Sequence, residues 1–320
     1  MKKLVLEGVN TLVVRDGATP VPTESEETVQ VEIAGLGGSE YLALANPGIR
    51  CLPNAMAHGI VGRASSGRRV AVYPLMGCEQ CDYCLSGMVQ LCNEWSMIGV
   101  HSDGGFSQQL ALPKNSLIDI PSSLSWEQSA FIEPFANSVN AVEIAGVTQD
   151  TSVGVIGLGG LGLGAVAACS KLGCDIIHSV DPSRSRTRAA QELGSQCLEY
   201  LEEGAFDVVF DTVGTKESRA TALRATRKLG CCVLLGFSSP KYEFEASAFI
   251  RSQKRMIGSF AFSKDQFVSA ILLAGMTKSK WVKSLSFDEV MGQLQDFSRG
   301  EFEVIKAVLR PNQGATPTDN

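Results

Sequence analysis

The sequence predicts an α/β protein with two domains, one built on a doubly wound parallel sheet and the other rich in β-strands. Three observations support this prediction. A glycine-rich unit between Thr151 and Asp181 has the order strand, turn, helix, strand. The first 35 residues instead contain runs such as Val29–Ile33, in which apolar and polar residues alternate as in a half-buried strand. With 320 residues, the chain is also too long for one ordinary core.

The glycine-rich unit has the features of a dinucleotide-binding turn. Its first strand, Val153–Ile156, is short and apolar. Three glycines follow with the spacing G-x-G-x-x-G, namely Gly157, Gly159 and Gly162. The first allows a tight turn, the second lets a pyrophosphate approach the backbone, and the third lets the helix pack on the strand. Asp181 ends the next strand, where a carboxylate accepts hydrogen bonds from ribose hydroxyls. The alternative is a glycine-rich turn that serves packing alone.

Four cysteines are clustered with the spacing C-x2-C-x2-C-x7-C, at Cys78, Cys81, Cys84 and Cys92. Two-residue spacers bring successive sulfur atoms to one centre, so four thiolates at this spacing can hold one tetrahedral zinc ion. Because four cysteines leave no open coordination position, we expect this zinc to be structural. An iron–sulfur cluster or simple buried thiols are the alternatives.

The segments around these motifs are predicted in less detail. Residues 34–62 are interrupted by glycines and prolines, which predicts loop and irregular structure. Residues 125–146 are predicted to form helices that Pro134 divides, the first of them capped by Ser125 with Gln128 in a capping box.

Strands and helices alternate beyond the glycine-rich unit. This rhythm continues to about residue 265, after which the pattern changes to helices and a last strand, Val304–Leu309. Residues 313–320 are polar and rich in turn formers, so we expect a disordered tail there.

Composition and charge argue against several classes of function. The net charge of −6 provides no basic surface for nucleic acid. No apolar run approaches twenty residues, so no transmembrane helix is expected. The opening MKKLVLEGVN is interrupted by Glu7 and Asn10 and predicts a strand and a turn, not a signal peptide. For the ten cysteines, a reducing cytoplasm and a metal site are then a better explanation than disulfides.

These segments together resemble the medium-chain dehydrogenase/reductase superfamily, specifically its zinc-containing alcohol and polyol dehydrogenase branch. The resemblance covers nearly the whole chain. It rests on the segments GRRVAVYPLMGCEQCDYCLSGMVQLC, IGVHSDGGF, EPFANSVNAV and VGVIGLGGLGLGAVAACSKLG, which follow one another in family order, and on the ending IKAVLRP. It implies a Rossmann doubly wound parallel sheet plus a GroES-like β catalytic domain. A small-molecule substrate and a homodimer or homotetramer are further implications.

The resemblance also implies a division of the chain. The GroES-like catalytic domain is expected over residues 1–146 and contains the structural-zinc loop 78–92. The Rossmann dinucleotide-binding domain is expected over 147–265, and residues 266–312 are expected to return to the catalytic domain.

The second zinc site of that family, the catalytic one, is incomplete in this sequence. The cysteine of the family's C-G-[ST]-D motif aligns with Gly37, and a nearby histidine aligns with Leu42. The family's G-H-E motif aligns with Ala57-His58-Gly59, and the glutamate of its E-P-L motif aligns with Glu133. His58 and Glu133 therefore remain as ligand positions, while two positions have become glycine. The resemblance thus predicts that a catalytic zinc is not firmly bound. Cys51 is the nearby spare thiol.

Without zinc, hydrogen-bond donors must stabilise the charge that develops on a substrate oxygen. The sequence offers Ser39, Tyr41 and His58, of which Ser39 aligns with the family's proton-relay hydroxyl. Together with Glu133 they are the candidate catalytic residues. Each also has a structural interpretation. Ser39 is then a loop cap, Tyr41 packs, His58 is a hydrogen-bonded structural histidine, and Glu133 is a helix-end acid.

The cofactor is predicted to be NAD(H) in preference to NADP(H). The carboxylate of Asp181 would repel a 2′-phosphate, whereas Arg184, Arg186 and Arg188 close by argue in the opposite direction. Arg186 aligns with a basic position that often lies beside the adenosine ribose in the family. The candidate cofactor-binding residues are Gly157, Gly159, Gly160, Leu161, Gly162, Asp181, Arg186, Val213 and Gly236.

Three functions are compatible with these features. The first is a nicotinamide-dependent oxidoreductase that acts on an alcohol/ketone pair without a firmly bound catalytic zinc. The second is a zinc-independent reductase of an activated C=C or C=N bond, which needs no metal to hold an alkoxide. The third is a non-catalytic nucleotide-binding protein.

Overall fold

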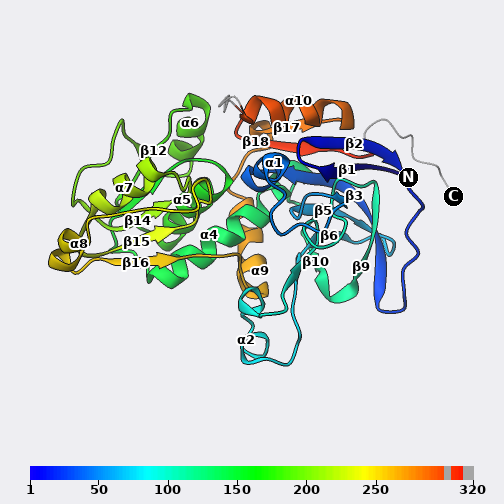
Figure 1. Ribbon diagram of the computed structural model, residues 1–320, viewed down its shortest axis with the longest axis horizontal. Coiled ribbons are helices and arrows are strands. Elements are labelled where there is room, and N and C mark those ends of the chain that lie inside the picture. The colour runs from blue at the N-terminus through cyan, green and yellow to red at the C-terminus, as the bar shows by residue number, and fades with distance from the viewer. Residues whose placement is uncertain (299–303, 313–320) are drawn as a thin grey trace. The chain divides into compact units, whose positions relative to one another are not determined.

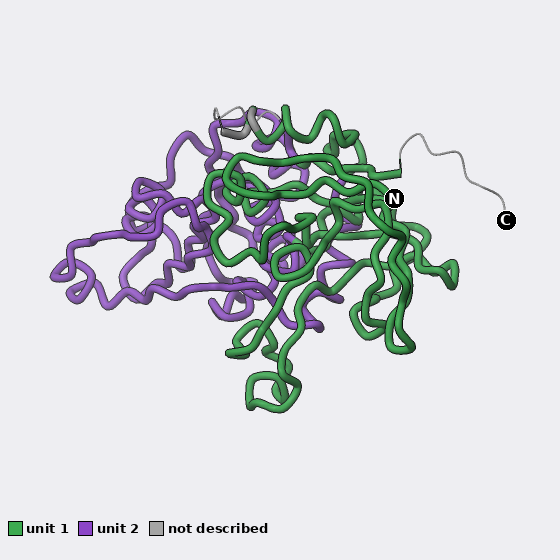
Figure 2. The backbone as a smooth tube through the Cα atoms, turned by 45° about the vertical axis from the view of Figure 1, so that its right-hand side comes forward, with its two compact units in different colours: residues 1–133, 278–302, 306–320 green, residues 134–277, 303–305 purple. Residues whose placement is uncertain are grey.

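The computed structural model describes residues 1–298 and 304–312, and it divides into two compact units. Figure 2 shows unit 1 in green and unit 2 in purple. Unit 1 consists of Met1–Glu133, Lys278–Phe302 and Lys306–Asn320, and unit 2 consists of Pro134–Thr277 and Glu303–Ile305. The predicted tail, residues 313–320, lies outside the described residues.

Unit 1 is built around a sheet with the strand order β10-β6-β5-β3-β18-β17, and β9 also pairs with β3. Within β3 (Glu26–Leu36) the side chains of Val29, Val31 and Ile33 are fully buried, which confirms the predicted alternation. β18 (Lys306–Leu309) is the last labelled strand in Figure 1. It runs antiparallel to the end of β3, with Ala307 opposite Leu36. A strand from the end of the chain therefore completes the sheet formed by the beginning.

The remaining strands of unit 1 are short. The main sheet also contains β5 (Ile60–Ala64), β6 (Arg69–Val72), β9 (Gln109–Pro113), β10 (Leu117–Asp119) and β17 (Val282–Leu285). A smaller sheet has the order β2-β1-β4 and contains β1 (Lys2–Gly8), β2 (Thr11–Asp16) and β4 (Asn54–Ala55). A two-stranded ribbon pairs β7 (Leu75–Met76) with β8 (Ser96–Met97) on either side of the cysteine loop.

The helices of unit 1 correct one prediction and confirm another. Residues 34–62 were predicted to be irregular, but α1 (Gly38–Ala45) begins directly after Gly37 and ends at Asn46. Its glycine-rich start hid it, because glycine is a weak helix former. The capping box of α3 (Trp126–Ser129) is confirmed: Ser125 accepts a hydrogen bond from the N–H of Gln128. The remaining helices are α2 (Asp82–Leu85) and α10 (Phe287–Ser298), with 3-10 turns at Val89–Leu91, Lys114–Ser116 and Ser279–Trp281.

Unit 2 contains a sheet with the order β13-β12-β11-β14-β15-β16, in which every neighbouring pair is parallel. The order reverses at β11 (Val153–Ile156), because β12 and β14 lie on its two sides. Such a reversal is the point at which doubly wound sheets bind ligands, beyond the carboxyl ends of the strands. The predicted Rossmann sheet is therefore confirmed.

The elements of this sheet alternate along the chain as strand and helix. The strands are β12 (Ile177–Val180), β13 (Gln196–Cys197), β14 (Phe206–Asp211), β15 (Thr226–Leu234) and β16 (Arg255–Gly258). The helices are α4 (Ile132–Ala145), α5 (Gly160–Leu172), α6 (Arg184–Glu192), α7 (Lys216–Ala225), α8 (Ala246–Ser252) and α9 (Lys264–Ala274).

The boundaries of the two units differ from the predicted divisions at 146/147 and 265/266. The structure divides after Glu133 and after Thr277, so that nearly all of α4 and the whole of α9 belong to unit 2. Hydrogen bonds explain the difference. The Ser138 hydroxyl donates to the carbonyl of Leu161 at 2.6 Å, and Gln266 donates to Asn140 at 3.2 Å.

Proline at position 134 does not divide the helix α4, because it stands in the first turn, where its missing N–H is tolerated.

Candidate functional site

The glycine-rich turn between β11 and α5 leaves no room for side chains at two of its glycines. Gly157 has a φ of +85°, a left-handed conformation that favours glycine. A Cβ at Gly162 would lie 1.8 Å from the carbonyl oxygen of Gly157, so the helix approaches the strand too closely for any side chain. A Cβ at Gly159, by contrast, would meet no atom within 4 Å. The turn is therefore tightly packed at Gly157 and Gly162. It is open at Gly159, where a ligand can reach the backbone.

The start of α5 is suited to an anion. Gly159 is the N-cap residue and provides no side-chain cap for the first N–H groups of the helix. Such free N–H groups and the helix dipole favour a phosphate. Gly160 and Leu161 form the first turn, in which Gly160 faces Pro134 and the Leu161 carbonyl accepts the bond from Ser138. The site fits the pyrophosphate of a dinucleotide.

Asp181 follows β12, and its carboxylate is fixed beside the same turn. One oxygen accepts the N–H of Leu158 at 2.7 Å, and the other accepts the N–H of Ser183 at 2.8 Å. Arg186 lies on α6 and donates from Nη2 to the carbonyl of Val304 at 3.3 Å. Burial lowers the pKa of Arg186, and the nearby Asp181 partly offsets this. The carboxylate keeps further lone pairs with which to accept ribose hydroxyls.

Val213 and Gly236 lie in the turns that follow β14 and β15. These two turns are in backbone contact, since a Cβ added at Gly236 would come within 2.1 Å of the Val213 carbonyl carbon. All the candidate cofactor residues except the helical Arg186 therefore lie at or just beyond the carboxyl ends of β11, β12, β14 and β15, or in the first turn of α5.

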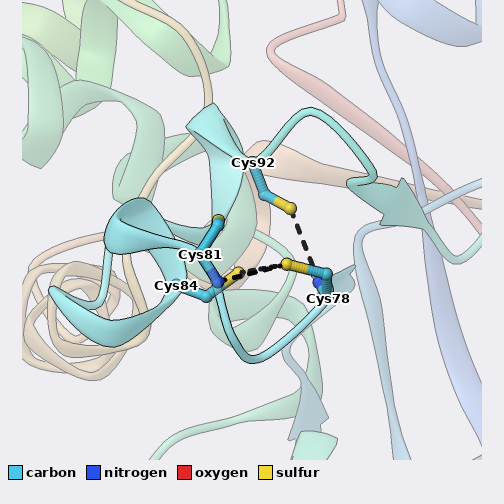
Figure 3. A group of neighbouring side chains, drawn as sticks. All are labelled: Cys78, Cys81, Cys84 and Cys92. Atoms are coloured by element: carbon cyan, nitrogen blue, oxygen red, sulfur yellow. Dashed lines mark hydrogen bonds between the residues drawn. The ribbon is translucent and has the colours of Figure 1, made fainter.

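The four clustered cysteines surround a common centre (Figure 3). Their sulfur atoms all lie within 4.8 Å of one another, compared with about 3.8 Å expected between ligands of a tetrahedral zinc whose Zn–S bonds are about 2.3 Å. Backbone N–H groups of Gln80 and Cys81 lower the pKa of Cys78 to about 7, whereas burial raises the pKa of Cys84 to about 12, so the case for a metal rests on the convergence of the four sulfur atoms. A Cβ at Gly77 would lie 2.6 Å from the sulfur of Cys84, so this position needs glycine. The residues fit a zinc ion.

The candidate catalytic residues of unit 1 are gathered around the imidazole of His58. His58 lies in the turn before β5, and Glu133 lies in the first turn of α4. The Nε2 atom of His58 lies 3.5 Å from Oε1 of Glu133, and the opposite ring atom, Nδ1, lies 3.3 Å from Oε1 of Glu40. The imidazole is thus held between two carboxylates, and all three side chains are at most 14% exposed.

Glu40 and Lys306 are members of this site that sequence reasoning did not single out. Lys306 on β18 is buried and donates from Nζ to the carbonyl of Leu36 at 3.3 Å. Burial raises the pKa of Glu40, but His58, Arg50 and Lys306 outweigh it and lower that pKa to about 2. Two signals were present in the sequence. Glu40 takes the acidic position of the family's C-G-[ST]-D motif, and Lys306 interrupts an otherwise apolar strand.

The charged neighbours also act on His58. Burial lowers its pKa, but the carboxylates of Glu133 and Glu40 outweigh burial and raise it. Burial lowers the pKa of Lys306, and the same two carboxylates partly offset this. The arrangement therefore favours an imidazolium between two carboxylates.

Ser39 and Tyr41 lie on α1 on either side of Glu40. The exposed hydroxyl of Ser39 donates to Oε1 of Glu40 at 3.1 Å and accepts from Nη2 of Arg50 at 3.1 Å. Tyr41 is partly exposed, and its backbone N–H donates to Gly37 within the helix. Ser39 is thus linked to His58 through Glu40.

Around His58, two side chains have the geometry of zinc ligands, and no third ligand converges with them among the described residues. The 3.5 Å between Nε2 of His58 and Oε1 of Glu133 would suit two ligands of one ion. A third ligand is missing: within residues 1–298 and 304–312, the four clustered cysteines are the only group of three or more potential ligands that converge. Gly37 offers no side chain, and a Cβ there would face Oε2 of Glu40 at 3.5 Å. Cys51 is exposed and does not join the group.

The other two histidines do not replace the missing ligand. His101 accepts the N–H of Met97 at Nδ1 and packs edge-on against Trp95. His178 lies on β12 and packs against Phe206. Both are thus engaged in local packing.

Comparisons with known proteins agree with the fold. Residues 24–122 match a family model described as the alcohol dehydrogenase GroES-like domain, and residues 160–274 match one described as zinc-binding dehydrogenase. L-galactonate-5-dehydrogenase of Escherichia coli (strain K12) is 27% identical over 291 residues, which cover 83% of this chain and 85% of that protein. Within the described part of the chain, no helix has the length and apolar character of a membrane span.

Two solved structures show the same fold over nearly their whole length. The acetophenone reductase from Geotrichum candidum, in complex with NAD, has a TM-score of 0.89 and 23% identity and covers 98% of both chains. A putative zinc-binding dehydrogenase from Sinorhizobium meliloti, bound to NADP, has a TM-score of 0.86 and 24% identity and covers 97% of this chain and 99% of its own. The chain therefore belongs to the zinc-containing, alcohol-dehydrogenase-like branch of the medium-chain dehydrogenase/reductase superfamily, and it is an NAD(P)-dependent dehydrogenase.

Proposed function

We propose that this protein interconverts a small-molecule secondary alcohol and its ketone with NAD(H), and that it does so without a firmly bound catalytic zinc. The observation that carries the proposal is the imidazole of His58 held between Glu133 and Glu40, beside a ligand position that is Gly37. The names of the relatives L-galactonate-5-dehydrogenase and sorbitol dehydrogenase support a polyhydroxylated substrate.

The cofactor would be held by unit 2. When bound, its nicotinamide ring supplies or accepts the hydride. The N–H groups at the start of α5 would bind the pyrophosphate, and Asp181 would accept the hydroxyls of the adenosine ribose. Two backbone N–H groups fix the Asp181 carboxylate beside the turn, where a carboxylate would repel a 2′-phosphate, and we infer a preference for NAD(H).

The chemistry at the substrate oxygen would fall to His58. In ketone reduction, Nε2 donates a hydrogen bond to the carbonyl oxygen and transfers its proton as the oxygen gains negative charge. In alcohol oxidation, Nε2 takes the hydroxyl proton. Glu133 competes for the same N–H and orients the ring, and Glu40 stabilises the imidazolium from the other side, as a carboxylate does in hydrolase triads. Ser39 and Tyr41 remain candidates for further donors to the substrate.

The cysteine loop would hold one structural zinc and no catalytic one. Four thiolates that close the coordination shell give a metal no open position, so the ion would fold the loop between β7 and β8. The structure pairs none of the ten cysteines in a disulfide, which supports a reducing compartment such as the cytoplasm. The family resemblance supports a homodimer or homotetramer.

Turnover after metal removal tests the proposal. The protein is first dialysed against a chelator strong enough to remove a zinc ion held only by His58 and Glu133. NADH- and NAD-dependent turnover is then measured on ketones, secondary alcohols and polyols. We expect turnover on at least one alcohol/ketone pair that survives dialysis and does not increase with added zinc. Turnover that is lost on dialysis and restored by zinc, or no turnover on any pair, would overturn the proposal.

A further inference from the structure

A second buried charge pair lies in unit 2, at the carboxyl end of β14. The carboxylate of Asp211 is fully buried, and its Oδ2 lies 4.0 Å from Nε of Arg219 on α7. The guanidinium is also largely buried, with 11% of the side chain exposed. Burying a charge is costly unless it is paired or hydrogen-bonded, so a pair at this place needs an explanation.

The Asp211 carboxylate organises the turn that follows its own strand. Oδ1 accepts the N–H of Val213 at 3.1 Å and the N–H of Gly214 at 2.9 Å. The main-chain carbonyl of Asp211 accepts two more N–H groups, from Leu235 and Gly236. One residue thus holds the turn after β14 and the turn after β15 at the same time.

Arg219 ties the same two turns together from the helix. Its Nη2 donates to the carbonyl of Gly236 at 3.2 Å, while its Nε faces Asp211. The turns touch directly as well. Gly214 has a φ of +80°, and a Cβ there would lie 2.1 Å from the carbonyl carbon of Gly236. The Ser239 N–H also donates to the carbonyl of Gly214 at 2.8 Å. The contacts between the turns are made by backbone atoms, whose positions the charge pair constrains.

We propose that Asp211 and Arg219 are positioning residues that hold the turns 212–214 and 235–239 in the geometry that receives the nicotinamide half of the dinucleotide. The inference rests on the proposed function, because it assigns the pair to the cofactor site. Asp181 and the start of α5 serve the adenosine and pyrophosphate parts, whereas Val213 and Gly236 are the candidate cofactor residues on the other half of the sheet. A preformed turn binds its ligand more tightly, since it loses less freedom on binding.

The affinity ratio of two ligands separates this positioning role from a general loss of stability. NADH occupies both halves of the site, and ADP occupies only the half beside Asp181. Arg219→Met removes the charge at similar side-chain length, and Asp211→Asn keeps the shape of the carboxylate. Arg224→Met is the matched control, because Arg224 is exposed on the same helix and donates to Thr221. We expect both pair variants to weaken NADH binding by about tenfold, equal to about 1.4 kcal/mol, while ADP binding changes by less than about twofold.

Amide hydrogen exchange of the cofactor-free protein gives a second readout. Arg219→Met should speed exchange at residues 212–214 and 235–239 but leave β11 and the glycine-rich turn protected as in the native protein. Equal weakening of NADH and ADP, or unchanged exchange in both turns, would overturn the inference. If the native protein binds neither NADH nor NADPH, the proposed function fails instead, and the exchange data still decide whether the pair holds the turns.

Discussion

Nδ1 of His58 and Oε1 of Glu40 lie 3.3 Å apart in a buried setting, at the place where the relatives' motif pairs an acid with a metal-ligand position. Gly37, which the family resemblance aligns with a ligand cysteine, offers no side chain, and the ring's other nitrogen faces Glu133. Two carboxylates on opposite edges of one imidazole favour its charged form. His58, Arg50 and Lys306 all place positive charge close to the Glu40 carboxylate.

Restoring the missing ligand should restore a metal site. Gly37→Cys places a thiol at the aligned cysteine position, and the nearest atom to its Cβ is Oε2 of Glu40 at 3.5 Å, an ordinary contact. With His58 and Glu133 it completes three ligands, the number found in open zinc sites. We expect Gly37→Cys to bind one more zinc per chain than the native protein. Gly38→Cys is the control, because a Cβ there also has free space, and it should bind no extra zinc. Equal zinc contents in the two variants would contradict the assignment of residue 37, His58 and Glu133 to one metal site.

The stability that the Glu40–His58 pair contributes should fall at both low and high pH. Its pKa is lowered to about 2 from 4.5, so its stabilisation is present above 4.5 and is lost as the pH falls toward 2. The pKa of His58 is raised from 6.5, so its contribution is present below 6.5 and is lost as the pH rises through the higher native value. Glu40→Gln should therefore cost most between pH 4.5 and 6.5, by about 3 kcal/mol, because it removes one of the two carboxylates that offset the buried cations of His58 and Lys306. Chemical unfolding of both proteins across the pH range measures this difference. A difference that does not vary with pH would show that the charges are not coupled.

Asp181 should set the choice of cofactor. Asp181→Asn keeps an oxygen that can accept the Leu158 N–H but removes the charge that would repel a 2′-phosphate. We expect NADPH affinity to rise by about tenfold, while NADH affinity falls by less. Titration of native protein and variant with both cofactors is the measurement. Tighter binding of NADPH than NADH by the native protein would refute the stated preference.

The cysteine loop should depend on its metal. Cys81→Ser removes one of four converging ligands, and we expect the variant to lose zinc and to melt at a lower temperature, because structural zinc contributes folding energy directly. Cys51→Ser is the control, since Cys51 is exposed and lies outside the cluster. Zinc content and melting temperature are measured on both. A native-like zinc content in Cys81→Ser would mean that the cluster does not hold the ion.

The local motifs could be predicted from the sequence because their chemistry depends on short spacings. The glycines from Gly157 to Gly162 and the cysteines from Cys78 to Cys92 each lie within one turn or loop. The site around His58 could be predicted only in part. Glu40, His58 and Lys306 come together because β18 joins β3 across the length of the chain. Nothing in the local pattern shows that pairing.

Two other features also depend on tertiary contacts. The helix α1 has a glycine start that local propensity disfavours, and it is held by contacts such as the hydrogen bond from the Asn10 N–H to the carbonyl of Leu44. Asp211 ends β14 and Arg219 lies on α7. The eight-residue separation between them does not by itself indicate that the two side chains meet.

The zinc content of the native protein, measured by mass spectrometry after exhaustive dialysis, tests the central claim most directly. The site around His58 lacks a third ligand, whereas the cysteine cluster has four. We therefore expect one zinc per chain, which Cys81→Ser removes and His58→Ala leaves in place. Two firmly held zinc ions per chain, one of them lost in His58→Ala, would contradict it.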